Sequence, residues 1–393
     1  MLETRKIFTD LIFLLSRLMP ARRNVFTLLT LFFLIAHCTF ISLAAGRQLR
    51  VSNKEFAQLI QRLSEEPGYF DSENLVSNEA SYLQVVGKLE KLKAGNGVYL
   101  GVGPEQNFTY IARTRPRMAI LLDIRKQNML YHLLFKALFD MSRNRAEYIS
   151  RLFCKPLPRK YAYSKQADVK DLLSVLEQIG PADTLFQTNW VEIEKRIRTK
   201  FQLPLTAAEV KSIRGIYREF FEQQFEIRFR SQGRPTYRFY PSFQEITLET
   251  DLEGKWKNYL NSEEDFLFLK KLHAGNLIIP VVGDFAGGKS LRAIGEYLKE
   301  KGETVSIFYV SNVEFYLIQN AVLGKYAENL KRLPVTDQSL IIRAYFRFPH
   351  PERRPGYISA TLLQRIKDFI QLLDAGRYLS YQDLGLLDYL GSE

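Results

Sequence analysis

Short apolar runs recur along the chain, and several are followed by a stretch with the apolar spacing of an amphipathic helix. The runs that we expect to form strands are 98–101, 118–122, 276–282 and 305–310. Each is nearly continuous in apolar residues, which is typical of strands that are buried on both faces of a parallel sheet. The pattern predicts an α/β protein with a Rossmann-like parallel sheet.

A helix is predicted at 52–66, where apolar residues recur at intervals of three and four. Ser52 and Glu55 have the spacing of an N-terminal capping box, and Thr206 and Glu209 repeat it. The same periodicity predicts further helices at 128–153, 169–178, 190–201, 206–229, 291–301 and 361–373. The helix at 291–301 joins two apolar runs, which indicates a second strand–helix–strand unit.

The order of these elements divides the chain into six segments. The core is expected in two halves, and the helical insert between them is of a kind that often forms lids or substrate walls. The predicted boundaries are 1–46 for a signal or membrane-anchor segment, 47–95 for an N-terminal helical cap, 96–155 for the first half of the core, 156–272 for a mainly helical insert, 273–350 for the second half and 351–393 for a C-terminal helical segment.

The amino-terminal segment has a long uncharged apolar stretch at 24–46, directly after Arg22 and Arg23. Its length is sufficient to span a bilayer. It also has the basic, apolar and small-residue order of a signal peptide, with a candidate cleavage site near Ala44 and Met19 as an alternative start. We therefore expect a membrane-anchored or exported (extracytoplasmic) protein that contacts the membrane through residues 24–46.

The net charge of +12 favours acidic surfaces as partners, but no run of Lys or Arg exceeds two residues. We therefore predict no specific nucleic-acid partner. The two cysteines, Cys38 and Cys154, lie far apart, and the four histidines have no paired metal spacing. The sequence predicts neither a disulfide framework nor a metal site.

The most informative motif is Gly101-Val102-Gly103, which follows the first core strand and opens a helix. The second strand ends on Asp123, twenty residues after Gly103. This order is typical of the first half of a Rossmann-type nucleotide site, in which the acid accepts hydrogen bonds from ribose hydroxyls. The alternative is a Rossmann-like unit that holds no ligand.

The third glycine of the dinucleotide motif is absent, and Glu105 and Gln106 occupy the first helical turn instead. A carboxylate there would repel a pyrophosphate, which disfavours NAD. S-adenosylmethionine has no phosphate and fits this turn better. The predicted cofactor-binding residues are Gly101, Gly103, Glu105, Gln106 and Asp123.

Polar residues also follow the two later core strands. In an open parallel sheet, ligands bind outside the carboxyl ends of the strands. Asp284, Asn312 and Glu314 are placed there, and we expect them to act as acid, base or ligand anchor. The alternative is that Asp284 and Asn312 cap backbone amides at turns.

The segment 283–290 matches the phosphate-binding pattern GxxxxGKS between a strand and a helix. Lys289 would then contact the terminal phosphates and Ser290 a magnesium ion. The strand before it comes late in the chain, however, and an exported protein would meet no ATP. A P-loop NTPase is therefore the less favoured alternative.

Several segments together resemble a family of uncharacterised bacterial proteins whose Rossmann fold is similar to class I S-adenosylmethionine-dependent methyltransferases. The resemblance covers about 50–345 and rests on the segments 68–79, 101–107, 123–125, 234–243, 262–266, 283–287 and 309–314. It implies the fold but not an activity, and the departure from ordinary methyltransferases at Glu105 leaves cofactor binding open. It also implies that the GxxxxGKS match is fortuitous, because the family has Pro and Ala at the positions of Gly288 and Ser290.

The sequence thus leads to an exported or membrane-anchored protein that binds S-adenosylmethionine or a similar nucleoside and acts as a methyltransferase. The alternative is a non-catalytic ligand-binding or structural protein on a degenerate methyltransferase fold.

Overall fold

A computed structural model describes residues 50–162, 168–233, 237, 239–378 and 380–392. The predicted membrane or signal segment, 24–46, lies outside these residues, so its role stays a prediction. In the described part of the chain, no helix is both long enough and apolar enough to cross a bilayer.

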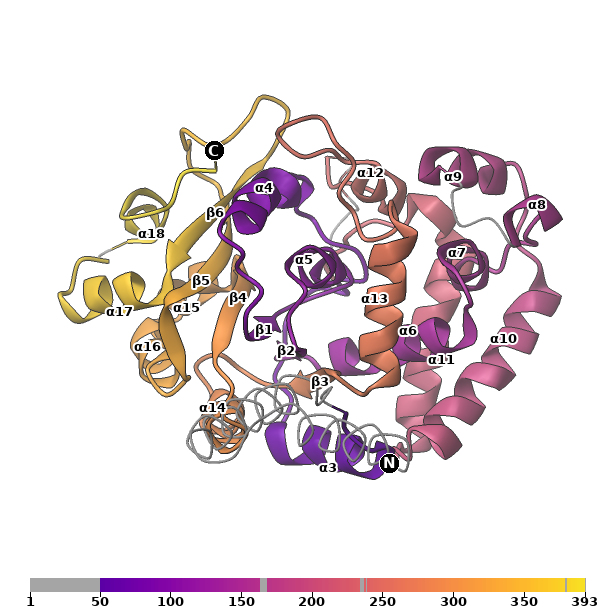
Figure 1. The fold of residues 1–393 in the computed structure, drawn as a ribbon, viewed down its shortest axis with the longest axis horizontal. Coiled ribbons are helices and arrows are strands. Elements are labelled where there is room, and N and C mark those ends of the chain that lie inside the picture. The colour runs from indigo at the N-terminus through magenta and orange to yellow at the C-terminus, as the bar shows by residue number, and fades with distance from the viewer. Residues whose placement is uncertain (1–49, 163–167, 234–236, 238, 379, 393) are drawn as a thin grey trace, which may run out of the picture. The chain divides into compact units, whose positions relative to one another are not determined.

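The centre of the fold is a six-stranded sheet with the order β3-β2-β1-β4-β5-β6 (Figure 1). Strands β1 to β5 pair in parallel, and β6 pairs antiparallel with β5. The strands are β1 (Val98–Gly101), β2 (Met118–Asp123), β3 (Ile278–Val282), β4 (Val305–Ser311), β5 (Val335–Phe346) and β6 (Ser359–Arg365). The α/β class and the largely parallel sheet are therefore confirmed.

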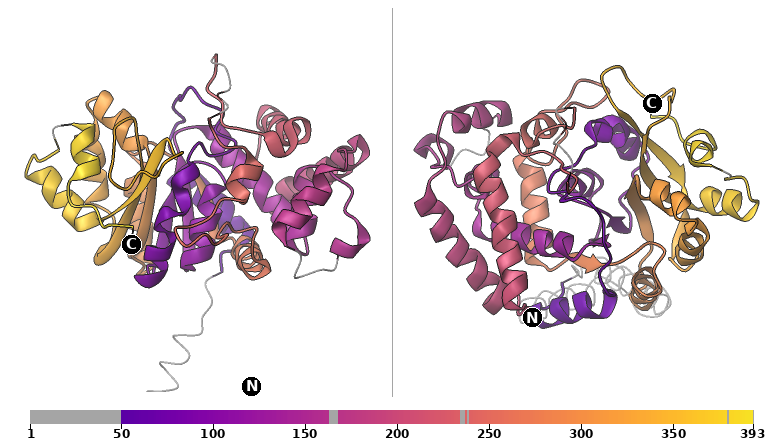
Figure 2. Two further views of the ribbon diagram at one scale, coloured as in Figure 1. Left: turned by 90° about the horizontal axis from the view of Figure 1, so that it is seen from above. Right: turned by 180° about the vertical axis from the view of Figure 1, so that it is seen from behind.

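Helices surround this sheet. Those before β3 are α3 (Asn53–Leu63), η1 (Ala80–Val85), α4 (Val86–Lys91), α5 (Gln106–Thr114), α6 (Lys126–Met141), α7 (Arg145–Leu152), α8 (Arg159–Ala162), α9 (Val169–Glu177), α10 (Asp183–Lys195), η2 (Arg196–Lys200), α11 (Ala207–Gln223), η3 (Gln224–Glu226), α12 (Phe243–Thr247) and α13 (Glu263–Ala274). Those after β3 are α14 (Ser290–Glu300), α15 (Val313–Gln319), α16 (Leu323–Leu330), α17 (Ile366–Asp374) and α18 (Tyr381–Leu386). Helices α7 to α11 lie together on the side of the molecule away from β5 and β6 (Figures 1 and 2).

Every residue of β1, β2 and β3 is buried, as expected for strands covered on both faces. Helix α6 packs on β2 and β3, while α17 packs on β5. Because the five parallel strands run the same way, the carboxyl ends of β1, β2, β3 and β4 share one edge of the sheet. That edge is where the sequence places its polar residues.

The helix predicted at 190–201 begins earlier, at Asp183, and two other predicted helices differ more from the structure. The stretch 128–153 contains two helices, because Asn144 accepts a hydrogen bond from the backbone amide of Glu147 and begins α7 anew. The predicted helix at 361–373 contains β6 first and α17 after it. Residues 359–364 are all buried against β5, and this pairing outweighs their local periodicity.

The second strand–helix–strand unit is present, but its strands are not neighbours. Helix α14 connects β3 at the sheet edge to β4, and both β2 and β1 lie between these strands. The connection therefore returns the chain to the centre of the sheet. The apolar pattern predicts each strand, but it carries no information on the order in which they pair.

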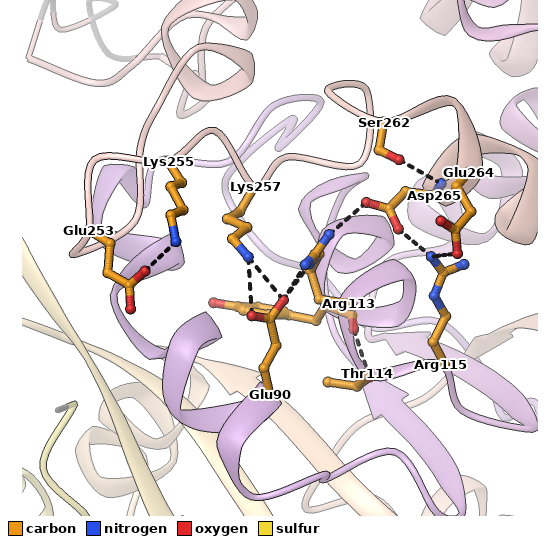
Figure 3. Close-up of polar contacts among 11 residues, drawn as sticks. Glu90, Arg113, Thr114, Arg115, Glu253, Lys255, Lys257, Ser262, Glu264 and Asp265 are labelled. Atoms are coloured by element: carbon orange, nitrogen blue, oxygen red, sulfur yellow. Dashed lines mark hydrogen bonds and ion pairs between the residues drawn. The ribbon is translucent and has the colours of Figure 1, made fainter. Parts of the chain in front are cut away.

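An ion-pair network fixes helix α5, which follows the glycine motif (Figure 3). Asp265 of α13 is buried and binds both Arg113 (Nη1–Oδ2 2.9 Å) and Arg115 (Nη2–Oδ1 2.6 Å). Glu90 of α4 binds Arg113 and also Lys257. Partial burial opposes ionisation of Glu90, but the hydrogen bonds from Arg113 and Lys257 outweigh it and lower its pKa. The network holds α4, α5 and α13 together.

Candidate functional site

A cavity of about 220 Å³ lies at the carboxyl ends of four strands. Its walls come from the residues that follow β1 (102–104), β2 (123–125), β3 (283–285) and β4 (311–313). The lining is completed by residues of the segment 69–79, of α15 and of the turn after it (320 and 322), together with Phe229 and Tyr309. This is the position at which open parallel sheets bind ligands.

The two glycines of the motif have different functions. Gly103 lines the cavity and has φ +86°, a conformation that favours glycine. Gly101 does not line the cavity, and a Cβ there would overlap Oδ1 of Asn107. The Asn107 side-chain amide donates to the carbonyl oxygens of Val102 (2.9 Å) and Pro104 (2.8 Å). Asn107 therefore holds the loop in shape, and Gly101 provides the space for it.

Glu105 and Gln106 do not line the cavity. The Glu105 carboxylate is buried and accepts a hydrogen bond from the hydroxyl of Tyr131 (2.6 Å). Burial raises its pKa to about 7. Glu105 would therefore not contact a pyrophosphate bound in the cavity, contrary to the expectation from the sequence.

Asp123 lines the cavity, as predicted, but its carboxylate is already held by Arg125. The guanidinium donates from Nη2 to Oδ2 (2.7 Å) and from Nε to Oδ1 (3.0 Å), and the Arg125 backbone amide adds a bond of 2.9 Å. Both side chains are nearly inaccessible to solvent. Oδ1 already accepts two hydrogen bonds, whereas Oδ2 accepts one and can accept another, so this pair can receive one ligand hydroxyl.

The three residues that we predicted as catalytic are separated. Asp284 and Asn312 line the cavity. Asp284 Oδ1 accepts from the backbone amide of Ala286 (2.9 Å), which is the capping role considered as the alternative. Glu314 does not line the cavity, because its carboxylate forms a buried ion pair with Arg343 (Nε–Oε2 2.7 Å).

The GxxxxGKS loop is occupied by a carboxylate of the same chain. Glu65 accepts hydrogen bonds from the backbone amides of Asp284 (2.7 Å), Lys289 (3.0 Å) and Ser290 (3.4 Å). Lys289 donates from Nζ to the carbonyl of Ser64, and the buried Ser290 hydroxyl donates to the carbonyl of Val282 (2.8 Å). The groups that would bind phosphate and magnesium are thus engaged within the chain.

Glu79 and Ser311 line the cavity but were not among the predicted site residues. Ser311 is the last residue of β4, where the rule that ligands bind at strand ends places it, and it lies in the segment 309–314 on which the family resemblance rests. Glu79 precedes β1 by nineteen residues and lies beside β4 only because the chain folds back. No local pattern could have placed it.

The charged residues that line the cavity are mainly acidic. It includes the carboxyl groups of Glu79, Asp123 and Asp284. Among its residues, all within the described part of the chain, Arg125 is the single Lys or Arg, and it is paired with Asp123. The site therefore presents more negative than positive groups to a ligand.

A family model described as a domain of unknown function (DUF7790) matches residues 74–386. This match includes every strand of the sheet and most of the cavity lining. No curated protein matches the chain. Membership of an uncharacterised family is thus confirmed, whereas the likeness to methyltransferases stays a prediction.

Proposed function

The chain belongs to the DUF7790 family, whose function is unknown, and we propose from its cavity that it binds a small nucleoside-type ligand, with S-adenosylmethionine as the first candidate. The proposal also takes the sheet to be Rossmann-like. The strand order supports this, because connections proceed outward from β1 on one side and from β4 on the other. Such a reversal marks the crevice in which Rossmann sheets bind nucleosides.

The acidic lining is the observation that carries the choice of ligand. A pyrophosphate would meet the carboxyl groups of Glu79 and Asp284, while the one guanidinium nearby is already paired. Phosphate sites are usually built from Arg, Lys or clustered backbone amides. A sulfonium or ammonium group is attracted by the same carboxylates.

Other parts of the cavity fit a nucleoside. Asp123 can accept hydrogen bonds from ribose hydroxyls, and the backbone at Gly103 allows close approach. Phe70 and Tyr316 line the wall with their rings 4.9 Å apart in an edge-to-face arrangement. Flat aromatic surfaces of this kind can pack against a base.

A non-catalytic binding protein is the second candidate, and the positions of Asp284 and Glu314 favour it. The first is engaged as a turn cap and the second as a buried ion pair. Of the three residues proposed as catalytic, only Asn312 has neither of these structural roles, so it alone remains for methyl transfer. We propose ligand binding as the function of the cavity and methyl transfer as the reaction that binding would permit.

The test is a thermal-shift comparison of the full-length protein with S-adenosylmethionine, S-adenosylhomocysteine, NAD and ATP. A ligand at 100 times its dissociation constant stabilises the folded state by about 2.7 kcal/mol. We expect stabilisation by the two S-adenosyl compounds and none by NAD or ATP, because of the acidic lining.

Lys289→Ala provides the matched control for the nucleotide alternative. Because Lys289 contacts the backbone of residue 64 and not the main cavity, this variant should show the same S-adenosyl shifts as the wild type. Magnesium-dependent ATP hydrolysis that is lost in Lys289→Ala would overturn the proposal in favour of a P-loop NTPase.

A further inference from the structure

Glu79 is a buried carboxylate that lines the cavity. Its side chain is 1% exposed, and it lies between the glycine loop and the end of β4. Oε1 accepts a hydrogen bond from the hydroxyl of Ser311, and Oε2 accepts one from Nε2 of Gln106 (3.2 Å).

Both donors are neutral, and Glu79 forms no ion pair with a cation of the described residues. Burial raises the pKa of Glu79, and the hydrogen bonds from Ser311 and Gln106 oppose this rise. Buried carboxylates are normally paired with a cation, because removal from water is costly. Among the other acids of this region, Glu90, Asp123, Asp265 and Glu314 are each paired with arginine, whereas the buried Glu105, which does not line the cavity, accepts from the neutral Tyr131 hydroxyl.

The backbone at Ser311 is irregular, and it directs the Ser311 side chain toward Glu79. Ser311 has φ +51°, which is uncommon for a residue with a side chain. The pairing of β4 with β5 is also irregular between Tyr309 and Ser311. Irregularities of this kind turn a side chain away from its regular direction, and they concentrate beside functional sites. Here the consequence is that the Ser311 hydroxyl contacts Glu79.

A second acceptor belongs to the same cluster. Gln106 donates through Nε2 to Glu79 and to the Tyr309 hydroxyl, which leaves its carbonyl oxygen Oε1. That oxygen is buried and has no hydrogen-bond partner among the described residues. Gln106 does not line the cavity, so Glu79 is the member of this cluster that a ligand can contact, and a protonated amine has the charge complementary to its carboxylate.

We propose that Glu79 anchors a protonated primary amine of the ligand in this cavity. This inference refines the proposed function by naming the group that the site recognises, and for an S-adenosyl compound the group is the α-ammonium. The ammonium supplies the positive charge that the protein itself does not place beside Glu79. Asp284 and the Asp123–Arg125 pair remain for other parts of the ligand.

The experiment compares two ligands that differ only in the amine, by calorimetry on the full-length protein. These are S-adenosylhomocysteine and its analogue in which hydrogen replaces the α-amino group. The wild type should bind the amine at least about tenfold more tightly, since tenfold corresponds to about 1.4 kcal/mol. In Glu79→Gln, which keeps the size of the side chain, this preference should disappear.

A control variant separates recognition of the amine from damage to the fold. Glu105→Gln makes the same change in a buried carboxyl group that does not line the cavity, so the preference should persist. An equal affinity for both ligands in the wild type, or an unchanged preference in Glu79→Gln, would overturn the proposal.

A third probe, 1,4-diaminobutane, distinguishes this inference from the nucleoside proposal. If neither nucleoside binds but the diamine stabilises the wild type and not Glu79→Gln, the amine site stands and the nucleoside proposal fails. 1,4-Butanediol at the same ionic strength is the neutral control. If the diamine and both nucleosides leave the wild type unchanged, the amine site is refuted.

Discussion

Replacing Glu314 by alanine is expected to lower the free energy of unfolding by about 3–5 kcal/mol. The variant would leave the Arg343 guanidinium, which is 1% exposed, without its carboxylate partner. Its remaining partners are neutral, namely Gln364 Oε1 (2.7 Å) and the carbonyl of Leu384 (3.5 Å). Urea denaturation of the wild type and the variant, followed by circular dichroism, measures the loss.

A double variant tests the cause of this loss. Glu314→Leu combined with Arg343→Met removes both charges, so it should be more stable than Glu314→Ala, although Gln364 still loses a donor. In conditions where Glu314→Ala stays folded, its ligand affinity should equal that of the wild type. If Glu314→Ala were as stable as the wild type but no longer bound ligand, Glu314 would be a residue of the functional site.

Replacing Glu105 by glutamine is expected to stabilise the protein at pH 8 by about 3 kcal/mol, with little effect near pH 4.5. Burial raises the pKa of Glu105 to about 7 in the folded state, whereas an unfolded glutamate has a pKa near 4.5. The folded state therefore prefers the neutral carboxyl, and the wild type loses stability as the pH rises from about 4.5 through 7. Glutamine does not titrate, so the variant avoids this loss.

The measurement is the difference in unfolding free energy between Glu105→Gln and the wild type across pH 5 to 8. Taking the difference cancels other titrating groups such as His132, whose pKa burial lowers to about 4 and whose protonation weakens the fold at acidic pH. A difference that does not change with pH would show that Glu105 is not the buried titrating group described above.

Much of the core could be predicted because its signals are local. The continuous apolar runs of β1 and β2, and the side-chain caps at Ser52 and Thr206, each depend on neighbouring residues alone. Strand β5 was not predicted, because it begins with the polar residues 336–339. Strand β6 was read as helix, because its burial comes from pairing with β5. Whether these two segments form strands is decided by contacts between residues far apart in the sequence.

The residues of the site also divide into those that local sequence could predict and those that it could not. The rule that ligands bind at strand ends correctly brought Gly103, Asp123, Asp284 and Asn312 to one cavity. Spacing does not reveal which way a side chain points in a first helical turn, so Glu105, Gln106 and Glu314 were assigned to a site that they do not line. The carboxylates of Glu65 and Glu79 reach their loops across the fold, and no sequence motif marks either contact.

If the cavity at the ends of β1 to β4 is the ligand site, a bulky side chain that fills this cavity should weaken ligand binding. Asn320 lines the cavity, yet it lies on an exposed position at the end of α15, so tryptophan there can fill the entrance without disturbing the core. Gln319 is the adjacent exposed residue and does not line the cavity, which makes Gln319→Trp the matched control.

Calorimetric titration of S-adenosylhomocysteine into these three full-length proteins gives the decisive comparison. We expect the wild type and Gln319→Trp to bind with equal affinity. The affinity of Asn320→Trp should be at least about tenfold lower, which corresponds to about 1.4 kcal/mol. Equal affinity in Asn320→Trp and the wild type, or no binding to the wild type, would contradict this expectation.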